Sequence, residues 1–344
     1  MMKPKKPRNI KLRSVHPLII LKGGVIDAVT EGKLPAWELD DQHVLINGNS
    51  MRLIGASSDR LFAEIIYVSE DSEEVPFSIK IEGVESNVKT LYVPKKISSN
   101  HVFGTSPICD LHGNIYFVDL KELQDNKQSI VYKYLRDQAK VQAFITDVTA
   151  PTSLAHFEGV LYVTSMVERK LYRCVGQGEC EVFSQGLGSV FGLAINALGE
   201  IFVGDQTGSL FKVDSTGRAA FFASLPETFK GYHFVFSPDN TLYISVPSSV
   251  GKNCIYRLDQ KNEPEIFLET MNILGGIAFA PDGLFYWVEN SRDEGAVYRI
   301  NTLGIKEKVV SGSFILGLTF TPQGDMVMTD LHNIYLIPQE WLEN

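Results

Sequence analysis

The sequence has little of what marks several large protein classes. Its 344 residues contain four cysteines, Cys109, Cys174, Cys180 and Cys254, and no two of them form the C-x-x-C pair of a zinc site. No segment approaches the roughly 20 apolar residues of a membrane-spanning helix, and the run "HPLIIL" is too short for a signal peptide. The net charge of −9 disfavours binding to nucleic acid or to an anionic membrane. We therefore expect a cytoplasmic protein.

Familiar catalytic motifs are also missing. The chain has no P-loop, no HExxH pair, no G-x-S-x-G elbow and no dinucleotide-binding glycine pattern followed by a helix. Cys174 and Cys180 flank "VGQGE", a hairpin-like turn across which a disulfide could form. Because cytoplasmic proteins keep their thiols reduced, we expect two free cysteines there.

What the chain does contain is a soluble, globular composition. Hydrophobic residues make up 44% and charged residues 21% of the sequence, which is sufficient for a large core. The basic cluster "MMKPKKPRNIKLR" is interpreted as a solvated tail over residues 1–15.

A repeat of about 40 residues fills the chain from residue 104 to its end. A turn followed by an apolar strand recurs with spacings of 46, 40, 41, 43 and 41 residues, and its turn residues are Gly113, Gly159, Gly199, Asn240, Gly283 and Gly324. Each repeat reads as four short strands, rich in β-branched and aromatic residues and separated by Gly, Asp and Asn. Four strands per unit and six units predict a six-bladed β-propeller over residues 95–344.

A second marker is an aliphatic–aromatic–basic–aliphatic tetrad such as "LFKV" or "IYRL", which we assign to the third strand of each blade. Its aromatic residues are Tyr132, Tyr172, Phe211, Tyr256, Tyr298 and Tyr335. We expect these aromatics to pack between neighbouring blades, and the basic residue that follows the first five of them to pair with an adjacent blade or face solvent.

The sixth repeat is one strand short. It supplies three strands and no fourth, and an open ring would leave a long unpaired edge. We expect the missing outer strand to come from "VPKKISSNHVF", with Pro94 at an edge position. Deletion of residues 1–103 would then destabilise the propeller, and deletion of residues 1–88 would be tolerated.

Residues 16–94 lack the period but still read as β-structure, so a β-sandwich is predicted. The segment resembles the IPT/TIG immunoglobulin-like domain in three places: Gly23-Gly24 opening a strand, the segment from Ile46 to Leu61, and the strand pair from Phe77 to Asn87. The fold class expected for the whole chain is all-β, an N-terminal immunoglobulin-like β-sandwich followed by the propeller.

The segments "FGLAINALGEIFVGD", "SPDNTLYIS" and "GGIAFAPDGLFYWVEN" resemble NHL-repeat propellers and the senescence-marker-protein/gluconolactonase family. The resemblance implies a divalent cation such as calcium on the propeller axis and hydrolysis of lactones. The family's metal-binding Glu aligns with Thr105, and its later Asn or Asp ligands align with Thr152, Phe191, Tyr232, Gly275 and Leu316. Since no carboxylate or Asn remains, we take the fold from the resemblance, expect no retained metal site, and leave a differently held cation open.

A ring of carboxylates is expected at the ends of the second strands, at Asp119, Asp205, Glu289 and Asp330. Together with Thr105, Thr152, Phe191 and Tyr232 it predicts an acid-rimmed, aromatic-floored ligand site at the mouth of the channel. The alternative is that each carboxylate caps backbone N–H groups of a nearby loop. His233 stands where the motif has a small residue, and it is either a catalytic base or a histidine held by a hydrogen bond.

Two functions follow. The first is a scaffold that binds a small molecule or a protein partner on its central face, with the immunoglobulin-like domain extending that surface. The second is a lactonase-like hydrolase or lyase with a rebuilt site, in which His233 is the base and Glu289 or Asp205 either orients it or binds a metal.

Overall fold

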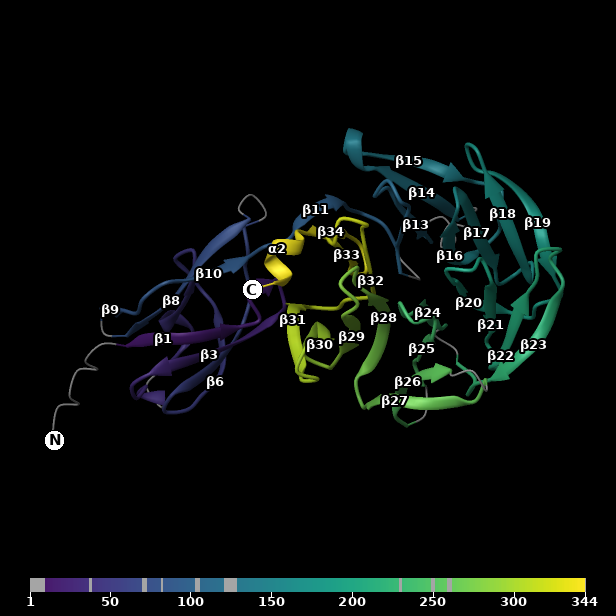
Figure 1. Cartoon of the computed structure of the whole chain (residues 1–344). Coiled ribbons are helices and arrows are strands. Elements are labelled where there is room, and N and C mark those ends of the chain that lie inside the picture. The colour runs from purple at the N-terminus through teal and green to yellow at the C-terminus, as the bar shows by residue number, and fades with distance from the viewer. Residues whose placement is uncertain are drawn as a thin grey trace.

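The computed structural model describes residues 10–36, 39–69, 73–81, 83–102, 106–120, 129–228, 231–248, 251–258 and 262–343. Most of these residues lie in strands, in two parts that touch along one side of a ring (Figure 1). No helix in the described ranges is long and apolar enough to cross a membrane.

Six units of four antiparallel strands form the ring, in agreement with the predicted six-bladed propeller; five are separate sheets, and the remaining unit is part of a ten-stranded sheet. The first three blades are β12 (Ile108–Cys109), β13 (Ile115–Asp119), β14 (Ile130–Leu135) and β15 (Lys140–Ile145); β16 (Pro151–Phe157), β17 (Val160–Ser165), β18 (Lys170–Val175) and β19 (Glu179–Gln185); and β20 (Val190–Ile195), β21 (Ile201–Asp205), β22 (Ser209–Val213) and β23 (Ala219–Ser224). The fourth and fifth are β24 (His233–Phe236), β25 (Leu242–Val246), β26 (Asn253–Leu258) and β27 (Pro264–Thr270); and β28 (Ile273–Phe279), β29 (Phe285–Asn290), β30 (Gly295–Ile300) and β31 (Lys306–Gly312).

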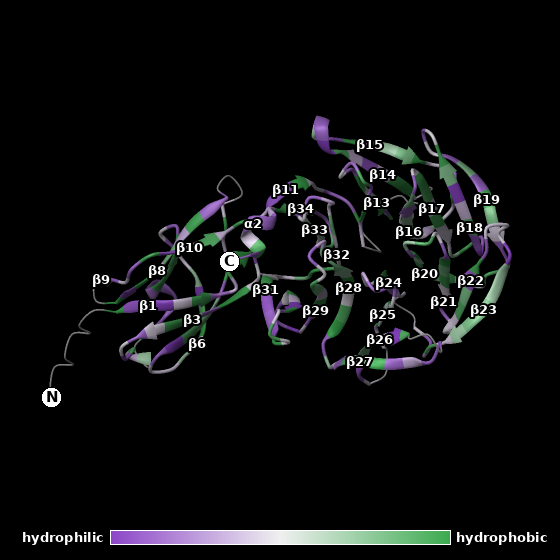
Figure 2. Ribbon diagram, in the orientation of Figure 1, coloured by the Kyte–Doolittle hydropathy of each residue, from purple (hydrophilic) through white to green (hydrophobic). Residues whose placement is uncertain are grey.

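The sixth blade is completed by a strand from before the first, as expected. It contains β32 (Gly317–Phe320), β33 (Met326–Thr329) and β34 (Ile334–Ile337), and its outer strand is β11 (Lys95–Ser98), antiparallel to β34. The inner strand of each blade contacts the inner strand of the next, including β12 with β32, so the ring is closed. Inner strands such as β28 are predominantly hydrophobic (Figure 2).

The third-strand aromatics pack between blades, as predicted. Tyr172 shares a core cluster with Val118 and Val131 of the preceding blade, and Tyr298 shares one with Ile255. One such aromatic per blade therefore stabilises each junction around the ring.

The basic residues after these aromatics form ion pairs within their own blade and not with an adjacent one, and the side chain of Arg257 is 43% exposed, in line with the expectation that these residues face solvent. Arg257 lies 2.8 Å from Glu265, and Arg299 lies 2.8 Å from Glu307. Both glutamates stand directly opposite their arginines on the outer strand, so the cross-strand register brings the charges together.

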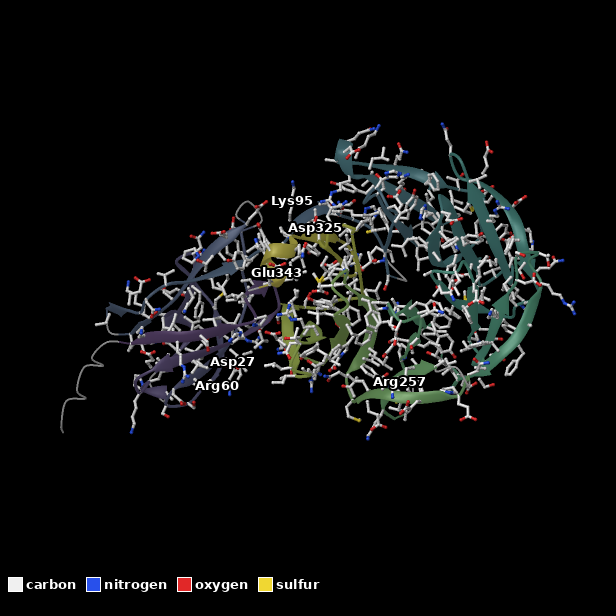
Figure 3. All side chains as sticks on the ribbon, viewed as in Figure 1. Asp27, Arg60, Lys95, Arg257, Asp325 and Glu343 are labelled. Atoms are coloured by element: carbon white, nitrogen blue, oxygen red, sulfur yellow. A yellow bond between two sulfur atoms is a disulfide. The ribbon has the colours of Figure 1, made fainter. Side chains whose placement is uncertain are left out.

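Two sheets make up the N-terminal part and share one hydrophobic core. One sheet has the order β1 (Lys11–His16), β3 (Val25–Glu31), β7 (Arg60–Glu64), β6 (Arg52–Ala56); the other contains β2 (Ile19–Ile20), β10 (Lys89–Tyr92), β8 (Glu74–Ile81), β4 (Val44–Ile46) and β5 (Asn49–Ser50), with β9 (Val84–Glu85) beside β8. Arg60 on β7 donates to Asp27 on β3, and both are labelled in Figure 3. Strand β1 begins at Lys11, inside the segment expected to be a tail, because its residues Leu12 and Val15 are buried in this core.

The two parts are joined by one continuous sheet. Strand β2 pairs in parallel with β10 on one side and with β31 on the other, so blade five extends into the N-terminal part. Ser311 accepts a hydrogen bond at its carbonyl from Leu21 N–H (2.8 Å) and at its hydroxyl from Val25 N–H (2.8 Å). The short helix α2 (Gln339–Leu342) adds Trp341, which stacks on Tyr92 at 4.9 Å between ring centroids.

Cys174 and Cys180 form a disulfide, so the expectation of two reduced thiols is wrong. The two residues are direct partners in the β18–β19 register, with their Cα atoms 4.1 Å apart. Because Cys174 and Cys180 face each other across the turn, their sulfur atoms are close enough to be bonded. The expectation of reduced thiols rested on the inferred cytoplasmic location and not on this geometry.

Candidate functional site

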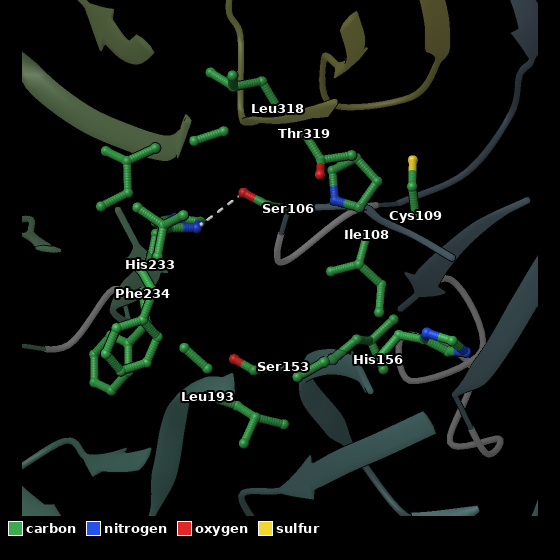
Figure 4. Close-up of a pocket in the computed structure, with 18 of the residues that line it drawn as sticks. Ser106, Ile108, Cys109, Ser153, His156, Leu193, His233, Phe234, Leu318 and Thr319 are labelled. Atoms are coloured by element: carbon green, nitrogen blue, oxygen red, sulfur yellow. Dashed lines mark hydrogen bonds between the residues drawn. The ribbon is translucent and has the colours of Figure 1, made fainter. Parts of the chain in front are cut away.

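The propeller encloses a cavity of about 300 Å³ on its axis, lined by the inner strands of the blades and the segment just before β12 (Figure 4). Each inner strand is fixed by its pairing with the second strand of its blade: Phe236 lies opposite Leu242, Phe279 opposite Phe285, and Phe320 opposite Met326. This common register arranges the inner residues in four tiers, with one residue from each blade in a tier.

The tiers differ in chemistry. Tier one contains Ser106, Ser153, Gly192, His233, Gly276 and Gly317. Tier two contains Pro107, Leu154, Leu193, Phe234, Ile277 and Leu318. Tier three contains Ile108, Ala155, Ala194, Val235, Ala278 and Thr319. Tier four contains Cys109, His156, Ile195, Phe236, Phe279 and Phe320. One end of the cavity is thus small and polar, the middle is apolar, and the far end is aromatic.

Tier one brings together a hydroxyl and an imidazole. Ser106 Oγ and His233 Nδ1 are 3.0 Å apart, as the dashed line in Figure 4 marks. Ser106 is close-packed against Gly317, where an added Cβ would lie 2.5 Å from Ser106 Oγ. Ser153 Oγ donates to the carbonyl of Phe191 at 2.5 Å. Gly276 and Gly317 therefore make room for Ser106, and Gly192 makes room for the ring of Phe234.

The cavity carries no fixed charge among its described lining residues. Burial lowers the pKa of His233 to about 4, so its imidazole is neutral at pH 7. Burial also lowers the pKa of His156 below its ordinary value. No Asp, Glu, Lys or Arg belongs to the described lining. The site suits an uncharged ligand, since a buried charge without a partner is costly.

The aromatic end is the more open one. All six residues of tier four are partly exposed, whereas in tier two only Phe234 is. Phe236, Phe279 and Phe320 come from three consecutive blades and offer apolar surface beside His156 and Cys109. Burial raises the pKa of the Cys109 thiol, which keeps it protonated and apolar in character.

Of the residues expected at the mouth, the structure brings Tyr232 and His233 into the cavity lining. Tyr232 also donates its hydroxyl to the carbonyl of Pro226 at 2.8 Å. Thr152 donates to the carbonyl of Val190 (2.8 Å) and Phe191 packs in the cluster between blades three and four, so neither belongs to the described lining. Thr105 lies outside the described residues.

The expected carboxylates hold local structure, and none belongs to the described lining of the cavity. Asp119 accepts from the N–H of Val102 (3.0 Å) and contacts His101 Nδ1 (2.7 Å). Asp205 accepts from the N–H groups of Thr207 (3.1 Å) and Ser209 (2.9 Å). This is the loop-capping alternative.

The other two carboxylates behave in the same way. Asp330 accepts from the N–H of His332 and of Asn333, both at 2.7 Å. Burial alone would raise the pKa of Glu289, but hydrogen bonds from Lys306 and from Trp287 Nε1 (2.7 Å) hold it below its ordinary value. Neither Glu289 nor Asp205 hydrogen-bonds to His233 in the described structure, so the rebuilt catalytic group is not assembled as expected.

Sequence reasoning missed Ser106, Ser153 and Thr319 as residues of the axis. The signal was present, because each stands in the same repeat motif as the glycines of "GGIAFA" and "LGLTFT". The family resemblance aligns its ligand positions with Thr152, Phe191, Tyr232, Gly275 and Leu316, and each of these stands one residue before a residue of tier one.

The residues at the axis do not fit the cation that the family resemblance implies. Calcium takes six to eight oxygen ligands, with carboxylates prominent among them. The described lining offers hydroxyls and imidazoles, and no cluster of three His, Cys, Asp or Glu that could hold a metal occurs in the part of the chain that the structure describes.

Comparisons with solved structures support the fold. A structural genomics protein of unknown function from Bacteroides thetaiotaomicron VPI-5482 matches with a TM-score of 0.60 and 12% identity, over 97% of this chain and 99% of that one. An auxiliary nutrient binding protein from the same organism matches with a TM-score of 0.53 and 12% identity, over 96% and 97% of the two chains. A putative gluconolactonase matches with a TM-score of 0.56 and 15% identity, over 70% of this chain and 90% of its own.

No family model and no curated protein matches by sequence. At these identities the likeness shows the fold alone: a propeller, and in the first two proteins a match that spans the N-terminal part as well.

Proposed function

We propose that this protein binds a small, uncharged, partly aromatic molecule in its axial cavity. The observation that carries the proposal is the arrangement of the four tiers, with hydrogen-bonding groups at one end and three phenylalanines at the more open end. Such a cavity, mostly apolar with a few convergent polar groups, is the usual form of a small-molecule site. Ser106, His233 and Thr319 fix the orientation of the ligand, and the phenylalanines hold its flat part.

The likeness to auxiliary nutrient binding proteins favours binding over turnover for the chain as a whole. Their names say nutrient binding, and the protein proposed here would take up a neutral compound in the same general way. Residues 16–94 would form an IPT/TIG-like sandwich that supports the propeller; the two sheets over one core favour this assignment.

A direct experiment uses phthalide, a neutral lactone fused to an aromatic ring, as the probe. Titration calorimetry should detect binding to the wild type, and Thr319→Phe, which fills tier three, should abolish it. Thr90→Phe is the matched control, because Thr90 is exposed on β10 in the N-terminal part. If Thr319→Phe is folded and binds phthalide as the wild type does, the axial cavity is not the site.

A hydrolase is the second candidate, on the strength of the 3.0 Å contact between Ser106 and His233. In that mechanism Ser106 Oγ attacks the lactone carbonyl while His233 accepts the hydroxyl proton, and water later releases the opened product. A pKa of about 4 makes His233 a weak base, since a general base works best with a pKa near the operating pH. The same phthalide samples decide the matter: ring opening that Ser106→Ala abolishes would establish catalysis.

The cytoplasmic location stays a prediction. The Cys174–Cys180 disulfide gives it a test, because bonds of this kind persist in oxidising compartments. Thiol counting on protein isolated with a rapid alkylating quench would show two free cysteines, Cys109 and Cys254, where the bond is intact and four where it is reduced.

A further inference from the structure

A second cavity, of about 400 Å³, lies where the N-terminal part meets the propeller. The N-terminal part contributes the turn after β2 and the end of β7, the closing strand β11 contributes Lys96, and the propeller contributes the link between blades five and six and the loop before β34. Junctions between domains are preferred places for ligand sites, because neither part alone has to be concave.

The walls of this junction cavity are mixed. Ile66 is 44% exposed and Phe314 is partly exposed, so both present apolar surface to a molecule placed there. Leu21 and Ile65 are buried behind them. A ligand of the cavity therefore has an apolar body.

Two lysines, Lys22 and Lys96, supply positive charge. Lys22 is exposed and forms no ion pair within the described residues. It stands before Gly23, whose φ of +79° is unfavourable for other residues and whose N–H is held by the carbonyl of Ile65 (2.7 Å). The backbone that carries Lys22 is thus fixed, and only its flexible side chain must be ordered by a ligand.

The acidic residues of the cavity are already engaged. Glu64 pairs with Arg52 at 2.9 Å, and Arg52 is not part of the described lining. Asp330 accepts from the backbone of His332 and Asn333 and from the hydroxyl of Tyr335 (2.8 Å). The charge of Glu64 is therefore balanced by Arg52, and the oxygens of Asp330 are occupied by hydrogen bonds, while the positive charge of Lys22 is left to the cavity.

We propose that the junction cavity is a second binding site, for a small organic anion whose carboxylate or phosphate group contacts Lys22 and Lys96 and whose apolar body lies on Ile66 and Phe314. An anion placed between two lysines gains charge-assisted hydrogen bonds, and its apolar portion gains burial. A molecule held in this way touches both parts of the protein, so its binding strengthens their contact.

The test uses the full chain and three probes that share a phenyl ring: phenylacetate, phenyl phosphate and the neutral phenylacetamide. We expect the two anions to bind, to raise the melting temperature, and to lose affinity at high salt, and phenylacetamide to bind at least about tenfold more weakly. A preference between carboxylate and phosphate then identifies the class of head group.

The variants locate the site. Lys22→Gln with Lys96→Gln should weaken anion binding by about tenfold or more, while the control pair Lys89→Gln with Lys95→Gln, which removes the same charge from neighbouring strand positions, should leave it unchanged. Lys95 is labelled beside the junction in Figure 3. Thr319→Phe should also leave anion binding unchanged. The proposal for the junction cavity and the proposal for the axial cavity can therefore fail independently.

Three results would overturn the proposal: no binding of either anion, equal binding of phenylacetamide, or anion binding that the Lys22 and Lys96 double variant retains. Melting curves of the unliganded variants show whether each is folded, and Lys22→Gln alone provides a milder change at an exposed side chain.

Discussion

His233 occupies a position that is Gly or Ser in the five other blades. Its imidazole contacts Ser106 Oγ at 3.0 Å, and Ser106 in turn packs against Gly276 and Gly317 of the same tier. Its position deep in the ring costs it the proton that a solvated histidine would accept near pH 6.5.

The first prediction concerns acid stability. The folded pKa of His233 is about 4, below that of the unfolded chain. As pH falls through 6.5 toward 4 the unfolded chain therefore gains a proton that the folded chain does not, and stability is lost over that window. The contribution is present above about pH 6.5. Between pH 7.5 and 4.5 the wild type should lose about 2 kcal/mol more unfolding free energy in urea titrations than His233→Gln does. If the unfolding free energies of the wild type and of His233→Gln change in parallel with pH, His233 does not cause the loss of stability.

The second prediction concerns Gly317. An added Cβ would meet Ser106 Oγ at 2.5 Å and the Cα of Ser106 at 2.6 Å, so the backbone must move. Gly317→Ala should cost about 1–3 kcal/mol, as overpacking in a tight core does, and should weaken phthalide binding as well. Gly55→Ala is the control, because nothing lies within 4 Å of its Cβ position. Equal melting temperatures for the two variants would show that tier one tolerates the shift.

The residues that line the axial cavity could be predicted from the sequence only in part. The repeat predicted six units of four strands, but the ligand positions expected at the axis were each assigned one residue early. Register shifts lie near the start of β16, β20 and β28 and account for three of these positions, whereas Tyr232 and Leu316 directly precede the first residues of β24 and β32. A bulge reorients the side chains that follow it, and no composition rule locates it.

At the scale of elements, the closing strand was predictable and the junction strand was not. An incomplete sixth repeat demands a partner, so β11 could be inferred from the missing strand alone. Strand β2 has two residues and carries no distinctive pattern. Its parallel pairing with β31 depends on the placement of the whole N-terminal part, which local sequence does not encode.

The third prediction tests the closure. Since β11 begins at Lys95, deletion of residues 1–93 retains this strand and deletion of residues 1–102 removes it. The longer deletion removes Ile97 from the cluster that contains Val327 and Ile334 and leaves the edge of β34 unpaired, and it should cost about 2–4 kcal/mol more in unfolding free energy. Denaturant titration of the two truncated proteins provides the comparison, and closely similar midpoints would mean that β11 contributes nothing to the ring.

At the scale of the whole molecule, a single ten-stranded sheet runs from the inner strand of blade five to the N-terminal part. One core cluster contains Ile19 and Leu21 together with Val310 and Ile315, so apolar contacts cross the junction beside the hydrogen bonds. Two parts that share both a sheet and a core should unfold together, unlike domains joined by a loose linker.

The fourth prediction follows from the closeness of that junction. A Cβ on Gly24 would lie 2.5 Å from the carbonyl oxygen of Ser311 and 2.9 Å from the nitrogen of Gly312, so Gly24→Ala must push the two parts away from each other. Calorimetry should show one transition for the wild type and two for Gly24→Ala, because the hydrogen bonds to Ser311 are lost while each core survives. Phenylacetate binding should weaken in the same variant and phthalide binding should persist, since the junction cavity is built from both parts and the axial cavity from the propeller alone. A single unchanged transition in Gly24→Ala would show that the junction accommodates the added methyl group and that the two parts still unfold together.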